Sequence, residues 1–166
     1  RWLLKAPGHM LGLTALNHVY PDAKFIQLHR DPVEVIPSMA SLSVALRTAF
    51  SDTLDEREIG RDTVDQWSRG LTHTLRLRKQ NADLDARFID INYKKLVSHP
   101  MEVVGRILEF TGLSSPANFE RKVEQHQVRN EKGRHGVHEY SLDRFGLKRS
   151  ELDDRFAEYR AEHLRI

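Results

Sequence analysis

Hydrophobic and polar positions follow two kinds of pattern in the first half of the chain. Short apolar runs at residues 2–4 and 24–28 are typical of buried β-strands. At residues 10–20 and 35–46, apolar side chains recur at steps of three and four, which predicts helices. Strands and helices that alternate with short connections between them favour a parallel sheet.

The second half continues the alternation. Residues 64–78 have the pattern of a long amphipathic helix, and residues 87–92 are predicted to form a third strand. Pro100 is suited to the first turn of a further helix, which Gly112 ends as a C-cap. The predicted fold class is therefore α/β, with three layers and a parallel sheet flanked by helices.

Two polar segments separate these elements. Residues 51–60 are predicted to be a loop or a lid, and residues 125–139, which contain Gly133 and Gly136, a second loop. Near the end of the chain, spaced apolar residues indicate short closing helices: Phe145, Leu147, Leu152, Phe156 and Tyr159. No repeat or linker divides the chain, so we expect residues 1–166 to belong to one domain.

Composition narrows the class of protein. With 26 Lys and Arg against 24 Asp and Glu, the net charge is only +2, which does not favour a nucleic-acid partner. Cysteine is absent, which suits a cytoplasmic protein and excludes thiolate chemistry. No apolar run approaches the roughly 20 residues that span a bilayer. His135 and His138 lack a third ligand at a convincing spacing, so no metal site is predicted.

The segment after the second predicted strand contains candidate residues for binding an anion. Arg30 follows that strand directly, and Asp31-Pro32 is typical of a helix start. Because ligands of open parallel sheets bind beyond the carboxyl ends of the strands, the guanidinium of Arg30 is suited to a phosphate there. Ser38, eight residues further on, adds a hydroxyl donor. An Arg that covers the surface and a solvated Ser explain this stretch equally well.

The preceding segment favours the phosphate interpretation. Lys5 follows the first predicted strand, so we expect it on the same edge of the sheet as Arg30. A lysine at one strand end is usually only solvated. A Lys and an Arg at neighbouring strand ends, followed by Ser38, form a less common arrangement, which favours a phosphate site over solvated side chains.

These motifs resemble the sulfotransferase superfamily, in particular tyrosylprotein sulfotransferases and related bacterial enzymes. The resemblance extends from Trp2 to about Leu113 and is weaker over residues 140–147. The segments that carry it are Leu4-Lys5-Ala6-Pro7, Tyr20-Pro21-Asp22-Ala23-Lys24-Phe25-Ile26, Arg30-Asp31, Ser38, and Ile91-Asn92-Tyr93 with the residues that follow as far as Pro100. The ordered set is more specific than any one motif.

The resemblance implies a fold related to P-loop NTPases and a role for individual residues. The sulfuryl donor would be 3′-phosphoadenosine 5′-phosphosulfate (PAPS), its product PAP, and no metal would be needed. Arg30 and Ser38 would hold the 3′-phosphate, and Tyr93 would lie near the adenine or that phosphate. Lys5 would stabilise charge on the departing phosphate, because sulfuryl transfer depends mainly on positioning and charge stabilisation.

Other roles stay open. His9 is the local candidate for the general base that accepts the acceptor's proton, and a histidine that only shapes the cleft is an alternative. Arg129, Lys132 and Arg134 lie in the segment where the superfamily often has a basic loop for the 3′-phosphate. A solvated loop accounts for them equally well.

The resemblance also implies that part of the donor site is missing. No Gly-, Ser- and Thr-rich loop for the 5′-phosphosulfate occurs in the chain, and it opens inside a predicted strand. We therefore expect part of a longer sulfotransferase, which alone binds the donor poorly and turns over little. The acceptor would be a hydroxyl or amine of a small molecule, carbohydrate or lipid. The alternatives are a non-catalytic nucleotide-binding or interaction module, and a kinase-like enzyme, which would need a phosphate loop that is absent here.

Overall fold

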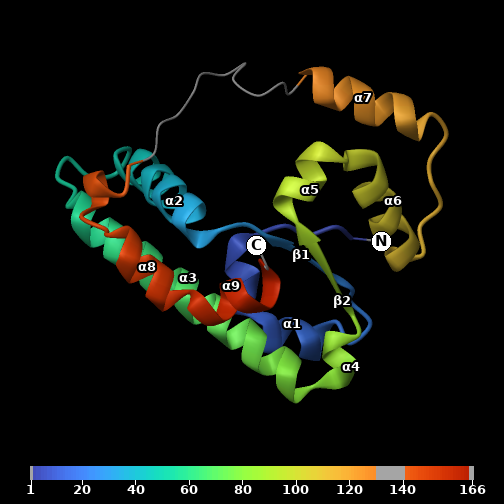
Figure 1. Cartoon of the computed structure of the whole chain (residues 1–166), viewed down its shortest axis with the longest axis horizontal. Helices are drawn as coiled ribbons and strands as arrows, with labels where there is room; N and C mark the ends of the chain where they lie inside the picture. The colour runs from blue at the N-terminus through green and yellow to red at the C-terminus, as the bar shows by residue number, and fades with distance from the viewer. Residues whose placement is uncertain (1, 130–140, 165–166) are drawn as a thin grey trace.

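A two-stranded parallel sheet lies at the centre of the computed structural model, which describes residues 2–129 and 141–164 (Figure 1). Strand β1 (Phe25–His29) pairs with β2 (Phe88–Asn92). The register sets Phe25 opposite Phe88 and His29 opposite Asn92, so both strands end at the same edge. The predicted α/β class with a parallel sheet is confirmed.

Helices form most of the remaining described structure. Those before and between the strands are η1 (Pro7–Met10), α1 (Leu13–Val19), α2 (Pro32–Arg47), α3 (Glu56–Gln80) and α4 (Ala82–Asp85). Those that follow β2 are α5 (Tyr93–Ser98), α6 (Pro100–Thr111), α7 (Phe119–Arg129), η2 (Asp143–Phe145), α8 (Arg149–Arg155) and α9 (Ala157–His163). In Figure 1, α3, α8 and α9 lie on one side of the strands, and α5 and α6 lie on the other.

The main core joins the middle of the chain to its end. Buried apolar side chains from α2, α3 and the segment after η2 pack in one cluster: Val33, Ile36, Ala40, Ile59, Leu71, Leu75, Phe145, Leu147, Leu152, Phe156, Tyr159 and Leu164. Removing this apolar surface from water is the main source of stability. The C-terminal helices are thereby held against α2, whose first residues follow the end of β1.

Local signals explain where two of the helices begin and end. Asp31 caps α2, because its carboxylate accepts a hydrogen bond of 3.1 Å from the Val33 N–H. Pro100 opens α6, and Gly112 ends it with a left-handed backbone of φ 66° that glycine adopts without strain. Both boundaries agree with the sequence prediction.

The predicted first strand is wrong. Residues 2–6 are not paired with another strand, and the sheet of the described residues contains only β1 and β2. Trp2 and Leu3 are 93% and 88% exposed. A strand is stabilised by its neighbours, and these residues have no neighbouring strand in the described chain.

Two predicted loops are partly helical. Helix α3 begins at Glu56 because Asp55 caps it, accepting hydrogen bonds from the backbone of Arg57 and Glu58, so residues 56–60 are not a loop. Helix α7 extends to Arg129, so residues 125–129 are helical and not a loop. The rest of that second predicted loop, residues 130–139, lies outside the described residues.

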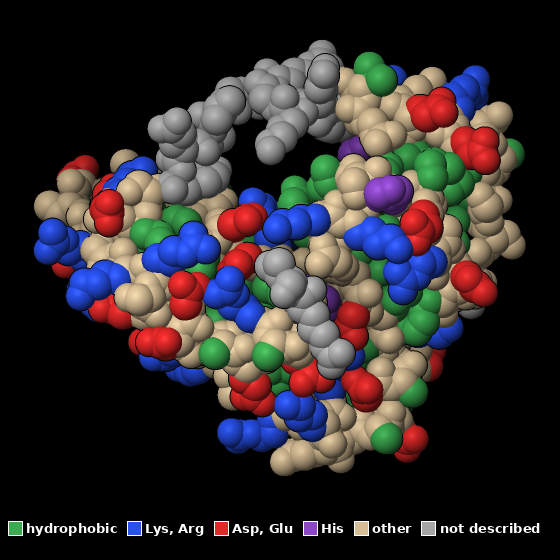
Figure 2. Space-filling model, in the orientation of Figure 1, with side chains coloured by type: hydrophobic (Ala, Val, Ile, Leu, Met, Phe, Trp, Pro, Cys, Tyr) green, Lys and Arg blue, Asp and Glu red, His purple; other side chains and the backbone are tan. Residues whose placement is uncertain are grey.

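No helix of the described residues is long and apolar enough to cross a membrane. Figure 2 shows basic and acidic side chains intermixed over the face it presents, in keeping with the small net charge.

Candidate functional site

Arg30 stands between the end of β1 and the start of α2. The strand ends at His29, and Asp31 and Pro32 begin the helix, so the backbone of Arg30 is fixed from both sides. Its Nε donates a hydrogen bond of 3.0 Å to the Glu34 carboxylate one turn into α2. Its terminal nitrogens have no hydrogen-bond partner in the part of the chain that is described.

Tyr93 occupies the equivalent place after β2. Asn92 ends the strand and caps α5, because its side chain accepts from the backbone of Lys94 and Lys95. Since β1 and β2 are parallel and in register, Tyr93 lies beside Arg30. The Arg30 guanidinium is 4.7 Å from the centroid of the Tyr93 ring, which is a cation–π contact. The structure thus brings together two of the predicted site residues.

An open pocket lies next to Arg30, which lines it, whereas Tyr93 is not among its lining residues. It has a volume of about 690 Å³, within the range of about 300–1,000 Å³ that is usual for small-molecule sites. Arg30, Glu34 and Pro37 line one side, and Lys148 and Arg149 line another. The sequence prediction missed Lys148 and Arg149, because no local motif links the start of α8 to the end of β1.

Ser38 is half-buried two turns into α2, and no hydrogen bond joins it to Arg30 or Tyr93 in the described structure. Its neighbour Pro37 lines the pocket instead. The expected role of Ser38 as a phosphate donor stays a prediction.

The two predicted catalytic residues lie near the start of the chain. Lys5 is exposed in the extended segment, so its expected place at a strand end is wrong. His9 is half-buried in the last turn of η1. Their proposed roles are not tested by these positions.

Most of the predicted basic loop lies outside the residues that the structure describes. Arg129 is the last residue of α7 and is exposed. Lys132 and Arg134, with His135 and His138, lie outside the described residues.

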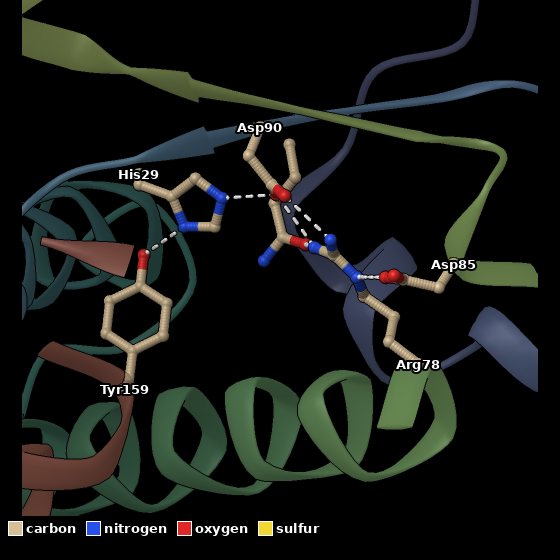
Figure 3. A network of polar contacts seen from close by, with 6 residues as sticks. His29, Arg78, Asp85, Asp90 and Tyr159 are labelled. Carbon is tan, nitrogen blue, oxygen red and sulfur yellow. Dashed lines mark hydrogen bonds and ion pairs between the residues drawn. The ribbon is translucent and has the colours of Figure 1, made fainter. Parts of the chain in front are cut away.

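Directly before Arg30, a buried polar network starts from His29, which is 2% exposed (Figure 3). The Tyr159 hydroxyl donates to Nδ1 of His29 over 2.9 Å, and Nε2 of His29 donates to Asp90 over 2.7 Å. The Arg78 guanidinium holds both oxygens of Asp90 at 2.7 Å and also binds Asp85. No sequence pattern indicated this network, because its members come from β1, β2, α3, α4 and α9.

The network sets the ionisation of two of its groups. Burial on its own would raise the pKa of Asp90, but the hydrogen bonds from Arg78 and His29 outweigh it and hold that pKa far below its usual value. Burial raises the pKa of the Tyr159 hydroxyl, and the charges of Asp90 and Asp31 raise it further. At neutral pH the network therefore contains a carboxylate and a protonated tyrosine.

His163 packs against this network, and together with His29 and Asp90 it provides the types of ligand that bind metal ions. Ligand atoms of His29, Asp90 and His163 lie within 4.8 Å of one another. However, the two imidazole rings are stacked, with centroids 4.1 Å apart and an angle of 14° between their planes. Each nitrogen lone pair lies in its ring plane, so two stacked rings do not direct lone pairs at one ion. Arg78 already neutralises Asp90, and the cluster is better described as an internal hydrogen-bond network.

The fold defines the class of α/β proteins with an open parallel sheet, in which ligands bind beyond the carboxyl ends of the strands. The particular family follows from a match of the sulfotransferase family model to residues 1–117. The chain belongs to the sulfotransferase family.

Individual relatives agree with this assignment. An omega-hydroxy-beta-dihydromenaquinone-9 sulfotransferase, Stf3, of Mycobacterium bovis and of Mycobacterium tuberculosis is 28% identical over 67% of the chain. The crystal structure of sulfotransferase STF9 from Mycobacterium avium has a TM-score of 0.84 and 31% identity over 97% of the chain. That of STF1 from Mycobacterium tuberculosis has a TM-score of 0.75 and 31% identity over 95%.

The chain spans only part of these proteins. It corresponds to 28% of the length of Stf3, 41% of the STF9 chain and 40% of the STF1 chain. The resemblance to sulfotransferases inferred from Lys5, Arg30, Ser38 and Tyr93 is thus confirmed at the level of the family.

Proposed function

We propose that the chain is the part of a PAPS-dependent sulfotransferase that binds the 3′-phosphate and adenine of the donor. The observation that carries the proposal is the pairing of Arg30 with Tyr93 beyond the carboxyl ends of two parallel strands. Open parallel sheets bind ligands at this edge, and the family match supports sulfuryl transfer.

The chemistry of the pair suits this part of the donor. A guanidinium forms two parallel hydrogen bonds with phosphate oxygens, and the terminal nitrogens of Arg30 are directed to no other described group. The Tyr93 ring offers a face for the adenine or a hydroxyl for the phosphate. Lys148 and Arg149 add positive charge to the same pocket.

In the proposed reaction, the acceptor oxygen or nitrogen attacks the sulfur of PAPS, the bond from sulfur to the 5′-phosphate oxygen breaks, and PAP leaves. Lys5 would stabilise the charge on the departing phosphate. His9 is one candidate base for the acceptor's proton. Ser38, Arg129, Lys132 and Arg134 remain proposed donor-binding residues.

For the acceptor, we propose a hydroxyl on an apolar molecule. The C-terminal half of α2 exposes Leu42 and Leu46, and the turn after it exposes Phe50 to 92%. The name of the relative Stf3 describes a menaquinone derivative with a hydroxyl group. A screen of the full-length protein with hydroxylated isoprenoids and with sugars would separate a lipid acceptor from a carbohydrate.

The direct test is calorimetric titration of the full-length protein with PAP, which keeps the 3′-phosphate and adenine. We expect Arg30→Ala to weaken PAP binding about 10- to 100-fold, because it removes charge-assisted hydrogen bonds to phosphate. Arg76→Ala, at an exposed position of α3, is the matched control and should bind like the unaltered protein. Equal affinity of Arg30→Ala and the unaltered protein would disprove the assignment.

A further inference from the structure

Helix α9 contacts the residues on both sides of Arg30 at the junction between β1 and α2. Tyr159 donates to His29 over 2.9 Å, and Arg160 donates to the Asp31 carboxylate over 3.0 Å. Two consecutive residues of α9 therefore hold the residues immediately before and after Arg30.

The hydrogen bonds of Tyr159 and Arg160 to the junction are shielded from water, so the loss of either one would destabilise the folded protein. His29 and Tyr159 are buried, and the Asp31 side chain is only 13% exposed. Asp31 uses one oxygen to cap α2 and the other to bind Arg160. A buried donor or acceptor that loses its partner carries its full desolvation penalty.

The junction is fixed from the sheet side as well. His29 bonds Asp90 on β2, and Arg78 of α3 holds Asp90 (Figure 3). The His29 side chain is buried, whereas the Arg30 side chain is about two-fifths exposed and meets Tyr93. Contacts on the buried side thus fix the backbone from which the Arg30 guanidinium extends.

We propose that Tyr159 and Arg160 are positioning residues for Arg30, so that α9 sets the affinity for the 3′-phosphate without touching the ligand. The inference rests on the proposed function. Preorganisation of this kind matters because a displacement of about 1 Å in a binding group can cost much of its effect.

The test compares PAP affinities of variants of the full-length protein. We expect Tyr159→Phe and Arg160→Gln each to weaken PAP binding about fivefold, since each loses one hydrogen bond that fixes the junction. Arg155→Gln is the matched control, because Arg155 lies on α8 and bonds Asp65 and Ser68 of α3 instead. It should bind within about twofold of the unaltered protein.

The decisive measurement repeats these changes in an Arg30→Ala background. A residue that acts through Arg30 loses its effect there, so Tyr159→Phe and Arg160→Gln should leave the residual PAP affinity unchanged. A role only in general stability would weaken binding by the same factor in both backgrounds and would overturn the proposal. If Arg160→Gln fails to fold, Tyr159→Phe, which removes one oxygen, decides alone.

The outcomes separate the two hypotheses. If Arg30→Ala weakens binding but the α9 variants do not, the positioning role is wrong and the proposed function stands. If PAP binds equally well with and without Arg30, the proposed function fails, and the positioning role fails with it.

Discussion

At the scale of single residues, the surroundings of His163 disfavour its charged form. Its Nε2 is buried without a hydrogen-bond partner, and its ring stacks on His29. Burial and the charges of His29 and Arg78 lower the pKa of His163 from about 6.5 to about 4, although Asp90 and Glu162 act in the opposite direction. The folded protein therefore resists protonating this ring.

This property predicts how stability depends on pH. Between about pH 6.5 and pH 4, His163 is protonated in the unfolded chain but neutral in the folded protein. The free energy of unfolding therefore falls as the pH falls. We expect His163→Phe, which keeps the stacking, to reduce the loss between pH 7 and pH 5 by about 1 kcal/mol, a value discounted for the partial exposure of the ring. Urea titrations at the two pH values measure it.

The exposed His18 lies outside this network, and His18→Asn serves as a control for the loss of an imidazole elsewhere in the chain. Asp90 does not interfere, because its lowered pKa costs stability only below about pH 3.8. An unaltered loss of stability in His163→Phe would show that another group titrates in this window.

At the scale of elements, α3 and η2 meet so closely that only glycine fits between them. A Cβ at Gly60 would lie 2.7 Å from the Cβ of Phe145 and 2.8 Å from its carbonyl oxygen. We expect Gly60→Ala to lower the free energy of unfolding by about 2 kcal/mol, because overpacking outweighs the better helix propensity of alanine. Urea denaturation followed by circular dichroism measures the change.

Gly105 in α6 is the matched position, since nothing lies within 4 Å of a Cβ built there. Gly105→Ala should stabilise the protein by up to about 1 kcal/mol through helix propensity. If both variants behaved alike, the contact between Gly60 and Phe145 would not be tight in solution.

The elements that local sequence could predict are those with local causes. The start of α2 at Asp31 and the end of α6 at Gly112 follow from capping chemistry within a few residues. The strand predicted at residues 2–4 failed because a strand depends on partners that no local pattern specifies. The start of α3 was placed too late because the polar composition of residues 51–60 was interpreted as a loop, although Asp55 is a local capping signal.

The same distinction applies to the site. Arg30 was predictable because it directly follows a strand, whereas Tyr93 was expected only from the resemblance to sulfotransferases; the parallel register of the two strands then explains their contact. Lys148 and Tyr159 were not, because packing of the C-terminal helices on α2 and α3 brings them to the end of β1. Long-range contacts of this kind leave no periodic signal in a single sequence.

At the scale of the whole molecule, the C-terminal segment returns to the end of β1 and completes the pocket with Lys148 and Arg149. Their present ion pairs are exposed, with Glu151 at 3.2 Å and Asp153 at 3.7 Å. Exposed pairs of this kind contribute little, so both side chains are able to exchange these carboxylates for a phosphate. The pocket is thus assembled from the start of α2 and the segment before α8, and its lining contains Arg30, Lys148 and Arg149 beside the carboxylates of Glu34 and Asp143.

This arrangement predicts a stronger dependence of PAP binding on salt than a single arginine would give. We expect the double change Lys148→Gln with Arg149→Gln to weaken PAP binding about tenfold at low salt and about twofold near 1 M salt, where the screening length is about 3 Å. The matched control is Arg121→Gln with Lys122→Gln, an adjacent, exposed basic pair on α7 that removes the same charge. Calorimetric titrations at both salt concentrations would measure the difference. Equal losses in the two double variants would mean that PAP senses only the net charge of the protein, whereas a loss confined to the first would locate the donor's phosphates between β1 and α8.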